Sequence, residues 1–451
     1  MLHRLTLTSL MAFTLLSATE EFTLQSMKKY LTKENPYIYS ALGKKYVTQE
    51  KLSYVEGVYD TKIVAKYDEK DYPSTYGTYY GASLEKPTES GIDLSAGYRY
   101  AEGTQEYNNI KTGEDGEFIA GAKIPLVSLL NQIDERRLRV GLTQMNLQNT
   151  DYEYKEAMRS FYFRLMSEYY TLLYNKSLLE VSKEMLQKIE KREGFFKENV
   201  QKGNIAEIVL LEAKQQVIHV RQEYIATKRT YENVFVEFLK YLNLSQEQFD
   251  ALYHLPELPK MQQEIFNLEE SLSTAMKNRA DFNVLRTEIE KLQLEDKNNE
   301  RKKFPEVNLG LYGVYDVNEQ SGFKVSLDMS FPIAQSQYKA KNAEIQESIK
   351  LINSNKDIRI LELKADLKSI INSLNTVSKN IQNAKEESAL LKKLEDAEKR
   401  KYELGSSTLF LLNQREMLSM QAQKKVLQYK LEYQLLFESY KRIISRHSLE
   451  S

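Results

Sequence analysis

The residue types that carry most protein chemistry are scattered or missing in this chain. Its 451 residues include no cysteine, and the four histidines (His3, His219, His254 and His447) lie far apart. Metal sites built on imidazole or thiolate need such ligands in clusters. The sequence also lacks a glycine-rich phosphate loop and a Gly-x-Ser-x-Gly nucleophile motif. We therefore expect no enzyme activity, no metal site and no cofactor.

The charged residues balance and point to no single partner. Lysine and arginine number 63 and the acidic residues 64, for a formal net charge of −1. A protein that binds nucleic acid usually shows an excess of basic residues, so nucleic acid is not an expected partner. A charged fraction of 28% with only 17 glycines and 8 prolines favours long helices exposed to solvent.

Two glycines stand at matching places in two long segments. About 78 helix-compatible residues separate Pro125 from Gly203, and about 73 separate Pro332 from Gly405. At ~1.5 Å per residue, each helix would reach roughly 110 Å. Another helix-compatible segment follows each glycine. Because glycine adopts left-handed backbone angles freely, Gly203 and Gly405 are predicted to end a helix at the tip of a helical hairpin.

Both long segments carry the apolar spacing of a coiled coil. Leu165, Leu172, Leu179 and Leu186 recur every seven residues. An unbroken stripe with steps of four and three follows in the second segment: Leu363, Leu367, Ile370, Leu374, Val377, Ile381 and Ala384. Such stripes predict helices that pack along their length.

The sequence before each of the two prolines resembles β-strands. Residues 92–100 alternate between apolar and polar side chains, and residues 117–124 read as a strand that enters Pro125. Residues 307–315 and 323–331 predict a β-hairpin. Residues 101–116 are polar and read as a loop. Tyrosines crowd residues 54–107, where they could serve ordinary strand packing or form an aromatic girdle at a membrane interface. The sequence is compatible with both interpretations.

The order of these segments predicts a duplicated chain. Residues 1–18 have the basic start, apolar centre and small-residue end of a signal peptide, with cleavage near Ala18. Residues 19–255 form the first repeat, with strands at about 60–126 and a long hairpin at 127–245. Residues 256–451 form the second, with strands at about 305–331 and a long hairpin at 333–446. The fold class is mainly α with β, built from duplicated helix–strand pair–long helix–helix units.

The two turns share a pattern. Residues 195–205 read FFKENVQKGNI, and residues 399–409 read KRKYELGSSTL. Each has an aromatic or basic helix end, a glycine and a small polar restart. With the signal peptide, the duplication and the two proline-led joints, these turns resemble those of the TolC-type outer-membrane efflux proteins, also called outer membrane factors. The resemblance covers essentially the whole mature chain.

The resemblance implies a homotrimer in the outer membrane of a Gram-negative cell. Each protomer would supply four strands to a shared twelve-stranded β-barrel surrounded by outer-membrane lipid, and its helices to a periplasmic α-helical barrel. The function implied is the exit duct of a tripartite efflux or type I secretion system. Such a duct passively conducts substrates delivered by an inner-membrane RND or ABC pump and a periplasmic adaptor.

The resemblance also implies two kinds of site residue. The tips that dock the adaptor would comprise Gly203, Asn204, Ile205, Tyr402, Gly405, Ser406 and Ser407. Many family members place acidic residues in the helix after the second tip, but this chain has Leu411, Asn413 and Gln414 there. These three are expected to form an apolar or amide constriction instead. Residues 59–100 exceed what two strands require, so an extra strand or loop is expected near the barrel.

Two other classes of protein fit parts of the sequence. A secreted or periplasmic coiled-coil scaffold would use the heptads, but it would not need the strands at 92–126 and 307–331. A periplasmic adaptor without channel activity carries one helical hairpin, whereas this chain predicts two.

Overall fold

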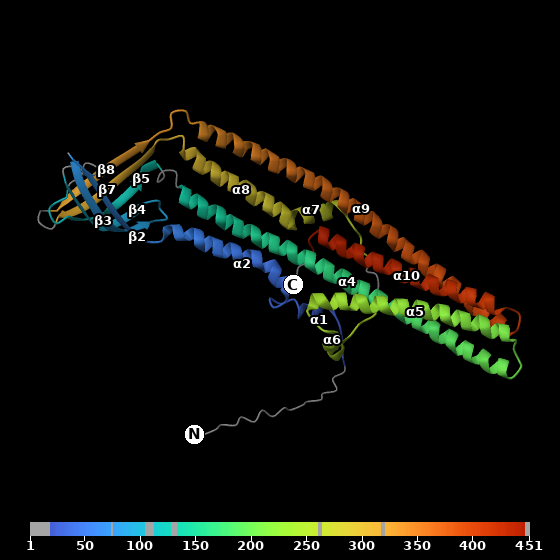
Figure 1. Ribbon diagram of the computed structural model, residues 1–451. Helices are drawn as coiled ribbons and strands as arrows, with labels where there is room; N and C mark the ends of the chain where they lie inside the picture. Colours follow the sequence, from blue (N-terminus) through green and yellow to red (C-terminus); the bar gives the residue numbers. More distant parts are fainter. Residues whose placement is uncertain are drawn as a thin grey trace, which may run out of the picture. The chain divides into compact units, whose positions relative to one another are not determined.

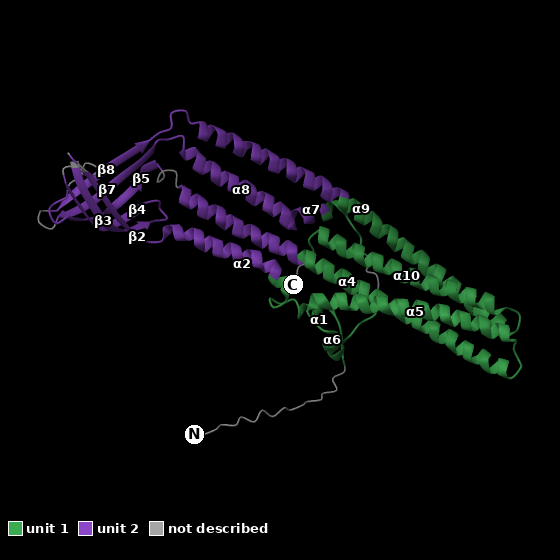
Figure 2. Ribbon diagram, in the orientation of Figure 1, with its two compact units in different colours: residues 1–39, 159–271, 366–451 green, residues 40–158, 272–365 purple. Residues whose placement is uncertain are grey.

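A computed structural model describes residues 19–73, 75–103, 112–127, 133–259, 264–316 and 321–446. The expected signal peptide, the middle of the 101–116 loop and most of the turn between the last two predicted strands lie outside the described residues. The chain divides into two compact units (Figure 2). The first unit comprises residues 1–39, 159–271 and 366–451, and the second comprises residues 40–158 and 272–365. Each unit combines segments from both halves of the sequence.

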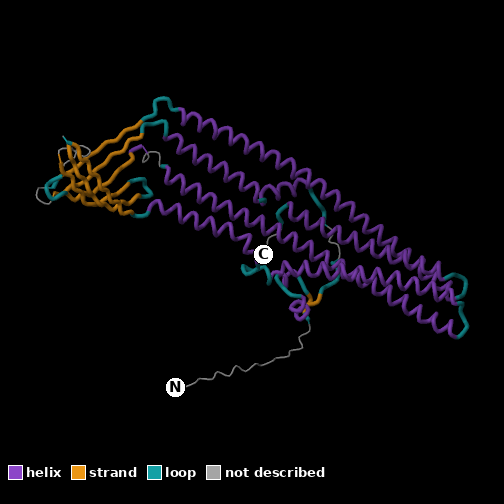
Figure 3. Tube along the Cα trace, in the orientation of Figure 1, coloured by secondary structure: helices purple, strands orange, loops and turns teal. Residues whose placement is uncertain are grey.

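Helices make up most of the described chain (Figures 1 and 3). In the first half they are α1 (Leu24–Lys28), α2 (Pro36–Glu56), α4 (Glu135–Gln201), α5 (Glu207–Leu242) and α6 (Gln246–Leu252). In the second half they are α7 (Leu268–Asn278), α8 (Ala280–Arg301), α9 (Ser336–Glu403) and α10 (Leu409–Ile443). The two long helices have nearly equal lengths, 67 residues for α4 and 68 for α9. None of the described helices is both long enough and apolar enough to cross a membrane.

The predicted apolar stripe of α9 is the buried side of that helix. All seven residues from Leu363 to Ala384 that follow the four-three spacing are buried. Leu165 and Leu172 of α4 are also fully buried. The long helices therefore owe their stability to packing along the stripe, because much of the rest of their surface is charged.

Six strands form one antiparallel sheet in the second unit. They are β2 (Lys62–Tyr72), β3 (Thr75–Pro87), β4 (Asp93–Gly103), β5 (Glu117–Pro125), β7 (Glu306–Asp316) and β8 (Gly322–Ser330). Their order in the sheet is β2-β3-β4-β5-β7-β8, so the two halves of the sequence meet where β5 pairs with β7.

The expectation of four strands per chain, with one strand pair in each repeat, is wrong. The first half supplies four of the six strands of the sheet, since residues 59–100 form β2, β3 and most of β4. The expectation of an extra strand in residues 59–100 is thus confirmed. Strand β2 pairs with β3 along its whole length, from Lys62 opposite Glu85 to Tyr72 opposite Thr75. The sequence signal there was weak because Val64 interrupts the alternation of β2. Backbone pairing with β3 compensates for that irregular pattern.

The helices of the second unit are joined to one another by ion pairs. Lys44 of α2 lies 2.6 Å from Glu153 of α4, and Lys341 of α9 lies 2.8 Å from Glu295 of α8. Lys44 and Glu153 are largely exposed, so their pair adds little to stability, whereas Lys341 and Glu295 are half-buried. Both pairs fix which helices are neighbours.

The first unit contains a short parallel pairing of β1 (Glu20–Glu21) with β6 (Tyr253–His254). Next to it, the ring of Phe22 is fully buried. It lies 5.0–6.1 Å from the rings of Tyr169, Phe238, Phe249 and Tyr253. This aromatic cluster attaches the start of the described chain to helices α4, α5 and α6.

Candidate functional site

One face of the six-stranded sheet is apolar. Residues opposite each other in a sheet share a face, as do alternate residues along a strand. The observed register therefore places the following residues together on the central part of the apolar face: Ile63, Ala65, Tyr67, Tyr80, Ala82, Leu84, Leu94, Ala96, Tyr98, Tyr100, Phe118, Ala120, Ala122, Leu309, Leu311, Tyr315, Phe323, Val325, Leu327 and Met329. Many of these side chains are exposed, including Ile63 at 80% and Phe323 at 85%. An apolar patch of this extent marks a surface that is covered by something other than water.

The opposite side of the sheet, the polar face, carries most of the charged residues of the strands: Lys62, Lys66, Asp68, Lys70, Glu85, Asp93, Arg99, Glu117, Lys123, Glu306, Asp316, Lys324 and Asp328. Arg99 and Glu117, opposite each other on β4 and β5, form an ion pair. On the apolar side, charged residues occur only near strand ends. The alternation of the strands thus separates an apolar from a charged surface.

Glycines reveal which way the sheet bends. On the polar face, a Cβ added to Gly97 would lie 2.4 Å from the carbonyl oxygen of Ala82, and one added to Gly121 would lie 2.1 Å from that of Leu311. On the apolar side, a Cβ on Gly313 would meet nothing closer than 3.9 Å. The strands therefore crowd together on the polar face at Gly97 and Gly121, where only glycine fits. The sheet curls toward its polar face and leaves its apolar face on the outside.

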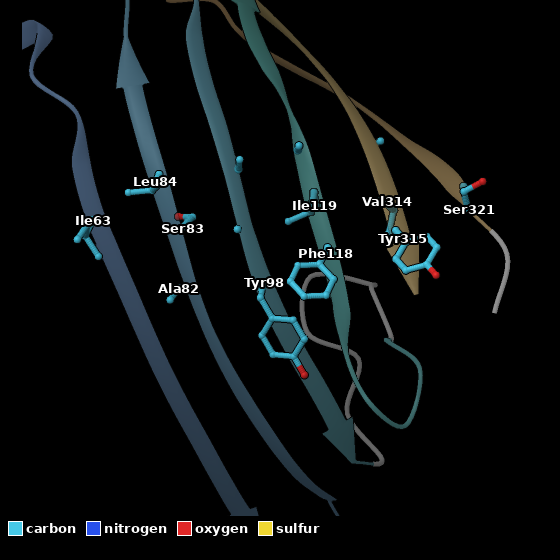
Figure 4. A pocket seen from close by; sticks show the side chains of 15 residues that line it. Ile63, Ala82, Ser83, Leu84, Tyr98, Phe118, Ile119, Val314, Tyr315 and Ser321 are labelled. Atoms are coloured by element: carbon cyan, nitrogen blue, oxygen red, sulfur yellow. The ribbon is translucent and has the colours of Figure 1, made fainter. Parts of the chain in front are cut away.

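Aromatic rings form a band across the apolar face, near the end where β2 turns into β3. Two adjoining cross-strand rows supply it: Tyr67, Tyr80 and Tyr100, and then Tyr98, Phe118 and Tyr315. The rings of Tyr80 and Tyr100 are stacked with centroids 4.8 Å apart. Figure 4 shows Tyr98, Phe118 and Tyr315 beside the aliphatic Ile63 and Leu84, which line the same open apolar trough of about 780 Å³. The remaining apolar face is mainly aliphatic.

The two predicted glycine caps have the same geometry. Gly203 and Gly405 have φ angles of 74° and 73°, in the left-handed region. The N–H of Asn204 donates to the carbonyl of Asn199 (2.9 Å), and that of Ser406 donates to the carbonyl of Lys401 (2.9 Å). These six-to-one hydrogen bonds define a Schellman motif, which satisfies the last carbonyls of α4 and α9.

The two tips, in which α4 leads into α5 and α9 into α10, are packed against each other in the first unit. Ile205 and Tyr402 are half-buried against a core shared by both tips: Phe196, Leu210, Ala213 and Leu409. Burial raises the pKa of the Tyr402 hydroxyl, although the charge of Arg192 opposes the rise. Ile205 and Tyr402 therefore contribute to the core that joins the tips.

The other tip residues lie closer to solvent. Gly203, Asn204, Gly405 and Ser406 are exposed. Ser407 is half-buried, and its hydroxyl donates to a carboxylate oxygen of Glu398 (2.5 Å). The exposed backbone of the two caps is thus the part of each tip that a partner could contact.

The three residues expected at a constriction follow the second tip on α10. Leu411 and Gln414 are exposed and Asn413 is half-buried. Leu411 and Gln414 are three residues apart and share a face of the helix. Glu416 is on another face and is 2% exposed. The nearest carboxylate on α10 is therefore inside the protomer.

A buried charge cluster surrounds Glu416 and was not predicted from the sequence. Lys188 of α4 lies 2.5 Å from Glu395 of α9 and 2.8 Å from Glu416 of α10. Arg192 of α4 lies 2.5 Å from the other oxygen of Glu416, and Lys392 lies 3.1 Å from Glu395. The cluster joins three helices just above the tips. Breaking a buried ion pair leaves an uncompensated charge, so these side chains depend on one another.

The cluster affects the ionisation of Glu395. Burial alone would raise the pKa of this carboxyl, but burial is outweighed by the polar neighbours together, with Lys188 contributing most and Ser419 and Lys392 adding to it. The pKa of Glu395 therefore lies below its ordinary value. A signal for the cluster was present in the sequence, because the four-three stripe of α9 continues from Ala384 through 388 and 391 to Glu395. A carboxylate at such a stripe position must find a buried cation.

The histidines remain apart in the structure. His219 is on α5, and the Nδ1 atom of His254 lies 2.9 Å from the backbone oxygen of Thr19. His3 and His447 lie outside the described residues. Within the described ranges, no group of three or more histidine, aspartate or glutamate residues has the arrangement of a metal site.

Neither the models of known protein families nor the sequences of curated proteins match this chain. Solved structures do. The outer-membrane channel CmeC of Campylobacter jejuni aligns over 93% of this chain and 85% of its own, with a TM-score of 0.66 and 12% identity. The outer membrane protein VceC of Vibrio cholerae aligns over 93% and 95%, with a TM-score of 0.66 and 11% identity. CusC, studied for its transmembrane channel formation, aligns over 94% and 92%, with a TM-score of 0.70 and 9% identity.

The chain thus has the fold of outer-membrane channels of the TolC type. This agrees with the resemblance of the tips, the proline-led joints and the duplicated order of elements. At 9–12% identity, the likeness concerns the fold alone and does not extend to substrates or partners.

Proposed function

We propose that this protein is the outer-membrane exit duct of a tripartite efflux or type I secretion system. It passively conducts substrates delivered by an inner-membrane RND or ABC pump and a periplasmic adaptor. The protein is a homotrimer in a Gram-negative outer membrane, with its helices in the periplasm. Energy is supplied by the pump, and the duct itself needs no cofactor.

The separation of the two sheet faces carries this proposal. A strand that crosses a membrane alternates between lipid-facing apolar residues and lumen-facing polar residues, and aromatic rings gather at the membrane interface. The sheet has an exposed apolar face, an aromatic band and a charged face toward which it curls. A water-soluble scaffold has no use for such a surface and would aggregate through it.

The paired tips support the docking of an adaptor. Gly203 and Gly405 form matching caps, and both tips expose backbone around them. The expected docking residues divide into an exposed set (Gly203, Asn204, Gly405 and Ser406) and a half-buried set (Ile205, Tyr402 and Ser407). The exposed set contacts the adaptor, whereas the half-buried set holds the exposed set in position.

Leu411, Asn413 and Gln414 form the periplasmic constriction in this proposal. Leu411 and Gln414 are exposed on one face of α10, and Glu416 is turned away into the buried charge cluster. In a symmetric oligomer, each exposed residue of that face forms a ring. The ring therefore presents leucine and amide side chains instead of carboxylates.

Membrane fractionation combined with an efflux assay tests the function. We expect the protein in the outer-membrane fraction, as an oligomer band on gels that disappears on heating. Deletion of its gene should increase sensitivity to toxic compounds, and the intact gene should restore resistance. Recovery of the protein in the soluble periplasmic fraction would favour the coiled-coil scaffold or adaptor and would contradict the proposal.

A cysteine variant tests the constriction separately. Because the chain contains no other cysteine, Gln414→Cys provides a single thiol per protomer. Cross-linking these thiols between protomers should block efflux, and a reducing agent should restore it. Three thiols form at most one disulfide, so unchanged efflux in trimers that carry this disulfide would remove Gln414 from the constriction.

A further inference from the structure

The sheet has two open edges. Among the described residues, β2 pairs only with β3 and β8 pairs only with β7, so each forms one edge of the sheet. A strand edge that faces lipid is not tolerated, because no water satisfies its backbone groups. Six strands are also too few for a barrel of one chain, since about eight are needed before side chains just fill the interior. The charged polar face therefore needs further strands to enclose it.

The two edges are complementary in direction. The chain runs away from the helices in β2 and back toward them in β8, since neighbouring strands are antiparallel throughout. Placed side by side in two copies related by rotation, β8 and β2 are antiparallel. The even number of strands per chain thus lets identical copies close a barrel without a parallel seam.

The residues select one register for this seam. The apolar faces of both strands must lie on the same side, which restricts the pairing to steps of two residues. Aligning the ends nearest the helices places Ser330 opposite Lys62 of the neighbouring copy. In that register, Lys324 lies opposite Asp68 of the neighbouring copy, where it adds a second cation to the carboxylate that Lys66 already contacts at 2.7 Å.

The neighbouring registers are less favourable. A shift of two residues in either direction sets Lys324 opposite Lys66 or Lys70, which places like charges across the seam. Asp328 then lies opposite Lys62 or Lys66, and this attraction only offsets the repulsion. The aligned register has no pair of like charges. On the apolar side it sets Val325 opposite Tyr67 and Leu327 opposite Ala65, which continues the apolar face from one copy to the next.

We propose that β8 of each protomer pairs with β2 of the next in this register, and that the trimer closes a barrel of eighteen strands. The proposal rests on the trimer of the proposed function. Barrels of 16–18 strands leave an aqueous channel, whereas an eight-stranded one is filled by side chains. The outer end of the duct is therefore a wide, water-filled pore lined by the polar face, and closure of the duct belongs to the helical end.

Paired cysteines test the register. In Leu327→Cys/Ala65→Cys, directly opposed Cα atoms would lie about 4.5–5.5 Å apart, within reach of a disulfide. Oxidation of the assembled protein in outer membranes with copper phenanthroline should give a covalent ring of three copies on denaturing gels. The controls Leu327→Cys/Ile63→Cys and Leu327→Cys/Tyr67→Cys shift the pair by two residues, roughly 7 Å, and should stay uncoupled.

A charge exchange provides a second test. Lys324→Glu should lower the temperature at which the trimer dissociates, because two carboxylates then face each other. Lys324→Glu/Asp68→Lys should restore that temperature in the proposed register. Failure of the exchange to restore it would contradict the proposed charge pair.

The outcomes of these experiments distinguish a failure of the proposed seam from a failure of the proposed function. Coupling in a control variant in place of the proposed pair would overturn the register, and a ring of two copies would overturn the eighteen strands. Absence of coupling in a protein that still fractionates with the outer membrane and supports efflux would refute the seam alone. Loss of membrane localisation in the protein without introduced cysteines would refute the proposed function.

Discussion

At the scale of single residues, the buried charge cluster joins three helices through ion pairs to two buried carboxylates. Lys188 alone contacts two carboxylates from two other helices, and both carboxylates are nearly inaccessible to water. Exposed ion pairs such as Arg221 with Glu190 also join helices but exchange their partners readily with water.

Lys188→Met should lower the thermal stability of the helical part. The substitution keeps an apolar stem but leaves Glu395 and Glu416 with one cation fewer, at a cost of about 2–3 kcal/mol. The melting temperature by circular dichroism in detergent measures the effect. Arg221→Met is the control, because it removes an exposed pair between α5 and α4 and should cost under about 1 kcal/mol. Equal losses of melting temperature in both variants would mean that burial of the cluster contributes nothing to thermal stability.

The lowered pKa of Glu395 predicts an acid-dependent loss of stability. A carboxyl whose pKa is lower in the folded protein stabilises it fully above its ordinary pKa of 4.5. That stabilisation is lost as the pH falls through the lower, folded value. Glu395→Gln removes it, so the gap in melting temperature between the parent and this variant should narrow as the pH falls from 6 to 3. Glu387→Gln, an exposed pair partner on the same helix, should show little gap at any pH.

At the scale of elements, the two glycine caps differ from Gly194, a glycine within the long helix that precedes the first cap. Gly405 has a positive φ with open space around it, so the backbone angle alone requires glycine there. Gly194 lies within α4, also with nothing near its Cβ position, but without a positive φ.

Alanine substitutions should therefore act in opposite directions. Gly405→Ala should destabilise the tip by about 1–2 kcal/mol, the cost of a left-handed angle for an L-residue. Gly194→Ala should stabilise α4 by up to about 1 kcal/mol, because alanine is the better helix former. Melting temperature and the rate of proteolytic cleavage at the tips report both effects. Unchanged stability of Gly405→Ala, or a loss of stability in Gly194→Ala equal to that in Gly405→Ala, would contradict the role given to the backbone angle.

The two faces of the sheet should respond differently to the same substitution. Ala96→Lys places a charge on the apolar face and should cost about 2–4 kcal/mol if that face meets lipid. Ser95→Lys, the neighbouring residue on the polar face, lies opposite Glu85 and should be tolerated. The amount of heat-modifiable oligomer in outer membranes measures assembly. Equal yields would mean that lipid does not contact the apolar face.

The sequence predicted helices and caps better than strands and charge partners. Heptad stripes such as the one from Leu363 to Ala384 report burial directly, because a buried helix face repeats every turn. The glycine caps were predicted because few residues adopt left-handed angles. The hairpin of β7 and β8 was found from its clear alternation, whereas β2 was uncertain because Val64 interrupts the pattern. Strand number in a sheet depends on pairing between distant segments, which no local pattern records.

The charge cluster was missed for a similar reason. Lys188 and Glu416 are more than 200 residues apart in the chain, and each looks like an ordinary charge on a solvated helix. Only the position of Glu395 on an apolar stripe distinguished it. The apolar and polar faces of the sheet likewise depend on the register, because the register decides which residues of the six strands share a face.

At the scale of the whole molecule, both compact units contain chain from both repeats, and α4 and α9 pass from one unit into the other without interruption. The described chain begins with an anchored segment in the first unit. Strand β1 pairs with β6, and Phe22 lies in the aromatic cluster.

The mature protein should begin at or near Thr19. Cleavage after Ala18 would leave β1 and Phe22 intact, whereas cleavage a few residues later would remove the pairing with β6. N-terminal sequencing of the protein purified from outer membranes tests this expectation. A start beyond Phe22 would contradict it. Phe22→Ala should lower the melting temperature by an amount equivalent to about 3–5 kcal/mol, because its ring is fully buried.

The aromatic cluster around Phe22 also constrains the order of folding. Phe22 precedes its partners Phe238, Phe249 and Tyr253 in the chain by more than 200 residues. Contacts between such distant residues form slowly, because a long loop must close first. The segment around Phe22 therefore completes its packing only after α5 and α6 have formed. Until then Phe22 stays in water, and a chaperone that shields this segment should accelerate the maturation of the protein.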